Sequence, residues 1–222
     1  MADYGSTRDR VETYFDRTAT AVWARLTTDQ PVSRVRETVR AGRDAMRATM
    51  LGRLPDDLRG ARVLDAGCGT GLMTAELAGR GADVVAVDIA PQLIDIAAAR
   101  LPATLVPRVT FRAGDMTDAA LGRFDFVMAM DSLIYYRTPD IAAVLDGFGG
   151  RTRGGVIFTV APKTAFLMAF FAAGKLFPRK DRSPTMVPQA LGALQKATGG
   201  RVHKIARISR GFYISECLEF RP

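Results

Sequence analysis

The spacing of hydrophobic and polar residues changes once along the chain, near residue 61. Before that point, hydrophobic residues such as Val11, Tyr14 and Phe15 recur at helical intervals with charged residues between them. A second helical stretch follows Ser33, a candidate N-terminal cap. The pattern predicts two or three N-terminal helices and no strand in this part of the chain.

From residue 61 onward, short β-branched segments alternate with stretches rich in alanine and leucine. The predicted strands are Arg62–Asp65, Asp83–Asp88, Val109–Ala113, Phe124–Ala129 and Gly155–Val160, and the predicted helices are Gly71–Arg80, Gln92–Arg100 and Pro139–Gly147. Alternation of this kind is typical of a parallel sheet with helices on both faces and right-handed crossovers.

The last sixty residues interrupt this alternation. An apolar stretch at 164–174 and a basic, proline-containing loop precede a short predicted helix at Pro188–Thr198. Two further strands flank Arg210–Gly211, and their tight connection predicts that they are antiparallel. We therefore expect an α/β, Rossmann-like, doubly wound seven-stranded sheet, mostly parallel with an antiparallel C-terminal strand, plus the N-terminal helices.

Composition narrows the class of protein. A length of 222 residues predicts a single domain. The net charge of +8 favours an anionic partner, namely nucleic acid, an anionic membrane surface or an acidic small molecule, unless it reflects an arginine-rich genome. Two cysteines, no signal-peptide pattern and no apolar run long enough to span a bilayer predict a cytoplasmic protein.

The segment "DAGCGTG" joins the first predicted strand to the next helix. Its glycines, Gly67, Gly69 and Gly71, allow a tight turn and a close approach of the backbone to a ligand. The spacing is G-x-G-x-G, so the last glycine comes one residue earlier than in the dinucleotide fingerprint G-x-G-x-x-G. The loop alone therefore leaves the identity of the ligand open.

Four aspartates lie at the ends of four successive predicted strands, and they favour a cationic ligand. They are Asp65, Asp88, Asp115 and Asp131. A carboxylate repels a pyrophosphate by about 1 kcal/mol at 4 Å even in water, whereas S-adenosylmethionine carries a sulfonium and an ammonium and no phosphate. A single aspartate at a strand end is often only a turn former or helix cap. Four of them beside a glycine loop predict a cofactor site.

Three of the four acids have an expected partner in that site. We expect Asp88 to accept hydrogen bonds from the ribose hydroxyls and Asp115 to accept one from the adenine amino group, beside the Met116 backbone. Asp131 faces the amino acid end or the transferred methyl. The neighbouring loop residues Cys68, a small filler rather than a nucleophile, and Ile89 complete the predicted lining.

The motifs "VLDAGCGTG", "VVAVDIA", "RAGDM" and "FDFVMAMDSLIYY" resemble those of class I S-adenosylmethionine-dependent methyltransferases. The flanks "RDRVETYFDRTATAVWARL", "FTVAPKTAFLMAFFAAGKLFP" and "RISRGFYISECLEF" resemble one family among them, the magnesium-protoporphyrin IX O-methyltransferases of bacteriochlorophyll and chlorophyll synthesis. This second resemblance spans essentially the whole chain.

The resemblance implies methyl transfer from S-adenosylmethionine to one propionate of the magnesium porphyrin, with magnesium carried by the substrate and no metal bound by the protein. It implies contact with the large subunit of magnesium chelatase. The apolar stretch at 164–174 and the basic loop after it predict peripheral association with photosynthetic membranes. The resemblance divides the single domain 1–222 into a helical lid (1–54), a cofactor-binding core (61–160), an acceptor-side insertion (161–200) and C-terminal strands (201–222).

Two tyrosines are predicted to contact the groups that react. By the resemblance, Tyr14 belongs to the lid at the open side of the cofactor, and Tyr135 stands where the family usually has histidine. A propionate is already ionised at pH 7, so no base is required. We expect Tyr14 and Tyr135 to orient the reacting groups. The alternative is that Tyr135 and Tyr136 are only packing residues.

Basic residues after the fifth predicted strand are candidate anchors for the porphyrin carboxylates. Lys163 and Arg210 are the predicted pair, and the other candidates are Lys175, Arg179, Lys180 and Arg207. The alternative is that they form a solvated surface. The lone histidine, His203, is predicted to be structural.

Three other functions remain to be weighed. Another small-molecule acceptor, such as a quinone precursor, would use the same cofactor site. Nucleic-acid methylation is disfavoured because "MDSLIYY" lacks the Asn/Asp-Pro-Pro-aromatic signature of adenine and cytosine N-methyltransferases. A non-enzymatic binding protein is disfavoured by the glycine loop and the four acids.

Overall fold

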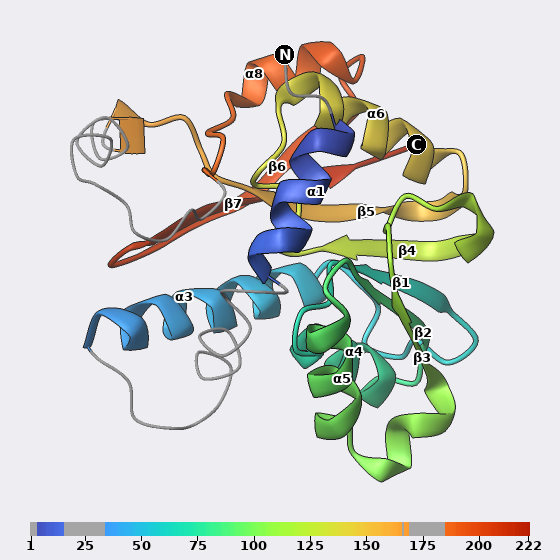
Figure 1. Ribbon diagram of the computed structural model, residues 1–222. Helices are drawn as coiled ribbons and strands as arrows, with labels where there is room; N and C mark the ends of the chain where they lie inside the picture. The colour runs from blue at the N-terminus through green and yellow to red at the C-terminus, as the bar shows by residue number, and fades with distance from the viewer. Residues whose placement is uncertain (1–3, 16–33, 166, 169–184) are drawn as a thin grey trace.

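The computed structural model describes residues 4–15, 34–165, 167–168 and 185–222. A single sheet forms its centre (Figure 1). The strands are β1 (Arg62–Ala66), β2 (Asp83–Asp88), β3 (Val109–Ala113), β4 (Phe124–Ala129), β5 (Thr152–Val160), β6 (Val202–Arg210) and β7 (Tyr213–Phe220).

The sheet has the order β3-β2-β1-β4-β5-β7-β6, which confirms the predicted seven-stranded, doubly wound topology. Strands β1 to β5 pair in parallel. Strand β7 is antiparallel to both of its neighbours, β5 and β6. The chain starts at the middle of the sheet and changes direction between β1 and β4, and ligands of such sheets bind at this switch point.

Helices cover both faces of the sheet (Figure 1). Helices α3 (Arg34–Leu51), α4 (Leu72–Gly79) and α5 (Pro91–Arg100) lie on one face, and α6 (Thr138–Gly149) and α8 (Leu191–Ala197) lie on the other. The remaining helix, α1 (Tyr4–Tyr14), crosses the carboxyl ends of the strands.

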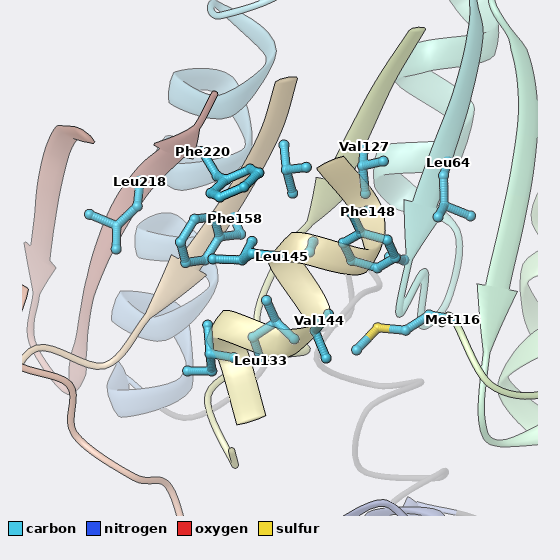
Figure 2. Close-up of a cluster of buried hydrophobic side chains, with 14 of the residues drawn as sticks. Leu64, Met116, Val127, Leu133, Val144, Leu145, Phe148, Phe158, Leu218 and Phe220 are labelled. Atoms are coloured by element: carbon cyan, nitrogen blue, oxygen red, sulfur yellow. The ribbon is translucent and has the colours of Figure 1, made fainter. Parts of the chain in front are cut away.

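Each face has its own hydrophobic cluster. Under α6, the side chains of Val144, Leu145 and Phe148 pack against β4, β5 and β7, as Figure 2 shows. On the other face, Met46 and Met50 of α3 are fully buried beside β1 and β7. The alternation of strands and helices predicted a sheet covered on both faces, and the two clusters confirm it.

Two predicted boundaries differ from the structure by three residues. Strand β5 begins at Thr152, three residues before the predicted start, because Gly154 continues the strand where the Phe126 ring leaves no room for a side chain: a Cβ there would lie 2.4 Å from that ring. The helix expected from Pro188 begins at Leu191. Residues before it are extended instead, since Gln189 pairs with Pro162 in a parallel bridge.

The short connecting segment Ala103–Arg108 (η2) forms a 3-10 helix that the hydrophobic pattern did not indicate. Another, Ala119–Leu121 (η3), is capped by Asp118, whose side chain accepts from the Ala120 amide. None of the helices within the described part of the chain has the length and apolarity needed to cross a bilayer.

Candidate active site

A cleft opens at the carboxyl ends of the strands, at the switch point between β1 and β4. Most residues predicted for the site line it: Asp65, Gly67, Cys68, Gly69, Asp88, Ile89, Asp115, Met116, Asp131 and Tyr135. The structure therefore brings together residues that are up to seventy positions apart in the sequence. Gly71, Tyr14, Lys163 and Arg210 lie outside this lining.

The glycine loop turns back against the end of β2. The amides of Gly67 and Cys68 both donate to the carbonyl oxygen of Val87, at 2.8 and 2.9 Å. Gly69 adopts φ +54°, and a Cβ there would meet no atom within 4 Å, so open space lies in front of its backbone. Gly71 has a different use, because its missing side chain lets α4 approach Ala97 of α5.

The two acids nearest this loop are deeply buried. The Thr74 hydroxyl donates to Asp65 Oδ2 at 2.6 Å, and Asp65 is 1% exposed. Burial, and to a lesser degree the charge of Asp88, raises the pKa of Asp65 to about 7. Asp88 accepts from the Gly69 amide at 2.8 Å and the Ala90 amide at 3.0 Å. Burial also raises the pKa of Asp88.

Asp115 connects the cleft to α1. Its Oδ1 accepts from the Tyr4 hydroxyl at 2.8 Å and from the amide and hydroxyl of Thr117, while Arg8 donates to its Oδ2 at 3.2 Å. Burial acts to raise the pKa of Asp115, but these hydrogen bonds outweigh it and hold the pKa below its ordinary value. The Tyr4 ring also stacks on Tyr136, with 4.9 Å between centroids.

Asp131 holds the other end of the cleft. Its Oδ2 accepts from Arg43 of α3 at 2.7 Å, and its Oδ1 accepts from Thr159 at 3.1 Å and from Tyr213 at 3.2 Å. Its backbone has φ +56°, in the left-handed region. Among the described residues it is the one non-glycine with positive φ. The carboxylate is thus fixed by three elements distant in sequence.

Tyr135 and Phe15 face each other across the cleft. Their rings make an edge contact with 6.2 Å between centroids, and both residues line the cleft. Tyr14 contacts Phe15 in the same way but does not itself line the cleft. Burial, followed by the charge of Asp131, raises the pKa of Tyr135. The Tyr135 hydroxyl therefore remains protonated at neutral pH, as a hydrogen-bond donor and not a base.

The predicted carboxylate anchors are less tightly placed. Lys163 and Arg210 are exposed and lie outside the cleft lining. Arg207 and Lys204 both donate to the buried Glu216, at 2.7 Å each, so their charges are largely used within the sheet. The candidates Lys175, Arg179 and Lys180 lie outside the described residues, as do Ser33 and most of the apolar stretch 164–174.

Sequence reasoning missed several residues of the site, namely the cleft-lining Tyr4, Arg8, Arg43 and Ser132, together with Tyr213, which donates to Asp131. The first three lie on helices whose sequence shows only an amphipathic pattern, and nothing in that pattern identifies the turn that faces the cleft. Tyr213 is in the "RISRGFYISECLEF" segment, which was singled out only by resemblance. Ser132 could have been found from its position, because it directly follows the predicted site residue Asp131.

These residues fit S-adenosylmethionine. Buried carboxylates suit its ammonium and ribose, and the open space at Gly69 admits the cofactor next to the loop backbone. The Ser132 hydroxyl oxygen is buried at the cleft and has no hydrogen-bond partner within the protein. An unpartnered buried hydroxyl is costly, and a polar ligand group in the cleft would satisfy it.

Comparison with known proteins decides the family. A magnesium-protoporphyrin O-methyltransferase from Rhodobacter capsulatus is 68% identical over 222 residues, covering 100% of this chain and 99% of that protein. The chain belongs to the magnesium-protoporphyrin O-methyltransferase family. Family models agree: residues 63–153 match "Methyltransferase domain" and residues 129–222 match "Magnesium-protoporphyrin IX methyltransferase C-terminus".

Other similar proteins differ in how much of the chain they match. The crystal structure of magnesium protoporphyrin IX methyltransferase from Synechocystis with bound SAH superimposes with a TM-score of 0.81 at 28% identity, covering 97% of this chain and all of that one. A ubiquinone biosynthesis O-methyltransferase from Xanthomonas oryzae is 35% identical, but over only 55% of this chain and 54% of that protein. Full-length similarity thus distinguishes the porphyrin family from the quinone one.

Proposed function

We propose that this chain transfers the methyl group of S-adenosylmethionine to one propionate carboxylate of magnesium protoporphyrin IX, giving the monomethyl ester and S-adenosylhomocysteine in (bacterio)chlorophyll synthesis. The full-length identity to a family member carries this conclusion, and the cleft at the switch point gives it a site. A quinone precursor as acceptor is not supported, since similarity to that class covers about half of the chain.

The cofactor end is built from the loops after β1, β2 and β3. When bound, the cofactor supplies a methyl group made electrophilic by its sulfonium. Asp65 stabilises the ammonium, and Asp88 holds the ribose hydroxyls, since each of its carboxylate oxygens has accepted one amide and can accept another hydrogen bond. Asp115 Oδ1 is saturated by Tyr4 and Thr117, whereas Oδ2 accepts only from Arg8 and can accept a second hydrogen bond, from the adenine amino group.

The acceptor end needs no general base. The propionate is ionised at pH 7, so its oxygen is already nucleophilic. The task of the residues is to align that oxygen with the methyl and to remove water, and alignment alone can contribute about 7–11 kcal/mol to a two-molecule reaction. Tyr135 donates a hydrogen bond to the propionate, and Tyr14, beside Phe15, helps α1 to close the cleft.

The macrocycle and its second propionate require a wider surface. Val11, Phe15, Leu72 and Met130 give the cleft an apolar side next to Tyr135, which suits a flat apolar ring. Lys163 and Arg210, which are exposed and lie outside the cleft lining, are proposed to attract the second propionate. Their exposure is compatible with that role because the second carboxylate does not react and can remain partly hydrated.

Substrate delivery extends the proposal. The large subunit of magnesium chelatase is the proposed donor of the porphyrin, and the excess of Lys and Arg, 31 against 23 Asp and Glu, favours a peripheral contact with anionic photosynthetic membranes from the cytoplasmic side. Co-purification with that subunit and flotation with anionic vesicles at low and high salt test the two contacts separately. Failure of either leaves the methyl transfer unaffected.

Turnover tests the main proposal. Purified protein is incubated with methyl-labelled S-adenosylmethionine and magnesium protoporphyrin IX, with metal-free protoporphyrin and a quinone precursor as controls. A labelled porphyrin monomethyl ester formed with magnesium protoporphyrin, and no labelled quinone, is the expected result. Binding of the cofactor without any labelled porphyrin would refute the acceptor and keep the cofactor.

A further inference from the structure

Gln189 is a buried polar residue whose bonds join three segments at the edge of the site. It lies between β5 and α8 and is 2% exposed. Its Nε2 donates to the carbonyl oxygens of Tyr136 and Val187, both at 2.9 Å, and its Oε1 accepts from the Thr138 hydroxyl at 2.8 Å. Both hydrogens of the amide and its oxygen are therefore used, in a place shielded from water.

The backbone of Gln189 pairs with residues that follow β5. Its amide donates to the Ala161 carbonyl and its carbonyl accepts from the Lys163 amide, each at 2.8 Å. The chain that leaves the sheet after β5 therefore returns at residue 189 to the point where it left. Gln189 thus joins the two ends of the segment 163–188. The proposed anchor Lys163 is the first residue of that segment.

The same side chain fixes the loop that carries the acceptor-side tyrosine. Residues 130–137 join β4 to α6 and supply Asp131, Tyr135 and Tyr136 to the cleft. On its inner side, this loop is held by Leu133, fully buried in the cluster of Figure 2. On its outer side it is held by the Gln189 bond to Tyr136 and by the Val187 amide, which donates to Ile134 at 2.8 Å.

We propose that Gln189 is a positioning residue for the porphyrin, acting through the loop that carries Tyr135. This inference rests on the proposed function and adds to it a residue that need not touch either substrate. The hydrogen bonds of Gln189 reach the ends of β5 and the β4–α6 loop and none reaches the glycine loop or the end of β2. Loss of Gln189 should therefore disturb the acceptor and spare the cofactor.

The test is a set of three variants of the full chain. Gln189→Met keeps the length of the side chain and removes its hydrogen bonds, and Thr138→Val removes only the bond to Oε1. Gln195→Met is the matched control, because Gln195 of α8 donates to the Val202 carbonyl at 3.2 Å, far along the chain from the β4–α6 loop. For each we would measure kcat, KM and the Kd of each substrate, with magnesium protoporphyrin followed by its Soret band.

The expected result is a split between the two substrates. Gln189→Met should lower kcat/KM for magnesium protoporphyrin by about tenfold or more, as loss of two or three hydrogen bonds within a positioned loop predicts, with the Kd for S-adenosylmethionine within about twofold of wild type. Thr138→Val should change kcat/KM in the same direction by about two- to fivefold. Gln195→Met should leave both substrates unaffected.

Other outcomes overturn the inference. A Gln189→Met protein that is less thermostable but has wild-type kcat/KM has lost only a structural bond, and one that loses both substrates alike has lost the whole site. If Gln189→Met does not fold, unchanged kcat/KM in Thr138→Val decides against the proposal. A wild-type protein that never methylates the porphyrin refutes the proposed function, and this inference with it, whereas an active wild type with indifferent variants refutes the role of Gln189 alone.

Discussion

The two ends of the cleft are assembled from contacts of very different range. At the cofactor end, Thr74 bonds Asp65 across 9 residues of sequence and the Gly69 amide bonds Asp88 across 19. At the acceptor end, Arg43 and Tyr213 reach Asp131 across 88 and 82 residues, and Gln189 reaches Tyr136 across 53. The part of the proposed cofactor end around Asp65 and Asp88 is thus a local motif, whereas Asp115 is held by Tyr4 of α1 across 111 residues. The proposed acceptor end exists only when the whole sheet has formed.

The comparison explains how the family can share its cofactor end with other methyltransferases and differ at the acceptor end. A local strand–loop–helix unit can be retained as a block. An end assembled from α1, α3, the β4–α6 loop and β7 can change its acceptor without altering the glycine loop. Substitutions should accordingly affect one substrate at a time.

The largest expected effect is at the cofactor end. Asp88→Asn keeps the shape of the side chain but replaces one of its two acceptor oxygens with an NH2 group. The two backbone amides and the ribose hydroxyls then compete for the one oxygen that remains. The Kd for S-adenosylmethionine should rise about 10- to 100-fold, as loss of hydrogen bonds to a charged group predicts, with little change in porphyrin binding. Isothermal titration calorimetry measures both. Asp83→Asn, an exposed aspartate at the other end of β2, is the control, and an equal loss there would contradict the assignment.

The pH dependence of stability and of cofactor affinity should distinguish the same two ends of the cleft. In the cofactor-free protein the pKa of Asp65 is about 7, above the value of 3.8 for an ordinary aspartate, so the folded chain binds more protons than the unfolded one between about pH 4 and 7. Its free energy of unfolding should therefore fall as pH rises through that window. The cofactor ammonium favours ionised Asp65, so affinity should increase with pH, by up to about tenfold per unit below pH 7.

The variant Asp65→Asn separates this effect from others. Calorimetric titrations of the cofactor between pH 5.5 and 8 should lose most of their slope in Asp65→Asn, since that side chain does not titrate. An unchanged slope would assign the proton to Asp88, whose pKa burial also raises, or to the cofactor itself. The Kd for the porphyrin should show no step attributable to Asp65.

A smaller effect is expected at the acceptor end. Tyr135→Phe removes a hydroxyl that orients the propionate, so kcat should fall about three- to tenfold, the value of one hydrogen bond, with the Kd for S-adenosylmethionine unchanged. Single-turnover kinetics with magnesium protoporphyrin measure it. Tyr136→Phe, which keeps the ring stacked on Tyr4, is the control. Wild-type turnover in Tyr135→Phe would reduce Tyr135 to a packing residue.

The smallest effect is expected where α1 joins the two ends. Tyr4→Phe removes one donor to Asp115 and keeps the ring on Tyr136, so α1 is held less firmly over the cleft. Release of S-adenosylhomocysteine should be about two- to fivefold faster, in line with one neutral hydrogen bond, as stopped-flow fluorescence can detect. Thr13→Ala alters an exposed hydroxyl of the same helix and should leave release unchanged. Slower release in Tyr4→Phe would argue against this role of α1.

The sequence separation of the contacts also determines which features could be predicted from the sequence. The alternation of strands and helices, the antiparallel β7 and the cleft acids followed from periodicity and from the rule that parallel strands end at one edge. Gly71 was assigned to the ligand because its spacing resembles that of Gly67 and Gly69, yet its space is needed by Ala97. Spacing within a motif does not tell which neighbour a glycine must admit.

The acceptor end could be predicted only in part. Tyr135 was found through the family resemblance, because it stands where the family usually has histidine. Arg43 was not found because α3 carries Arg34, Arg36, Arg40, Arg43 and Arg47, and only the packing of that helix decides which of them faces the cleft. That packing depends on Gly42, where a Cβ would lie 2.7 Å from the Tyr213 ring. A contact of this kind has no signature in either segment alone.

The left-handed backbone of Asp131 has a consequence for how the protein can be improved. An aspartate at φ +56° costs the fold about 1 kcal/mol relative to glycine. Glycine would relieve this strain but would remove the carboxylate that pairs with Arg43, and loss of one partner of a buried ion pair costs about 3–5 kcal/mol, so Asp131→Gly should lower the free energy of unfolding. The same exchange would leave Arg43 and Tyr213 facing an empty place in the cleft. The strained backbone of Asp131 is therefore the cost of an ion pair that joins β4 to α3, and a more stable variant should be sought elsewhere on the chain.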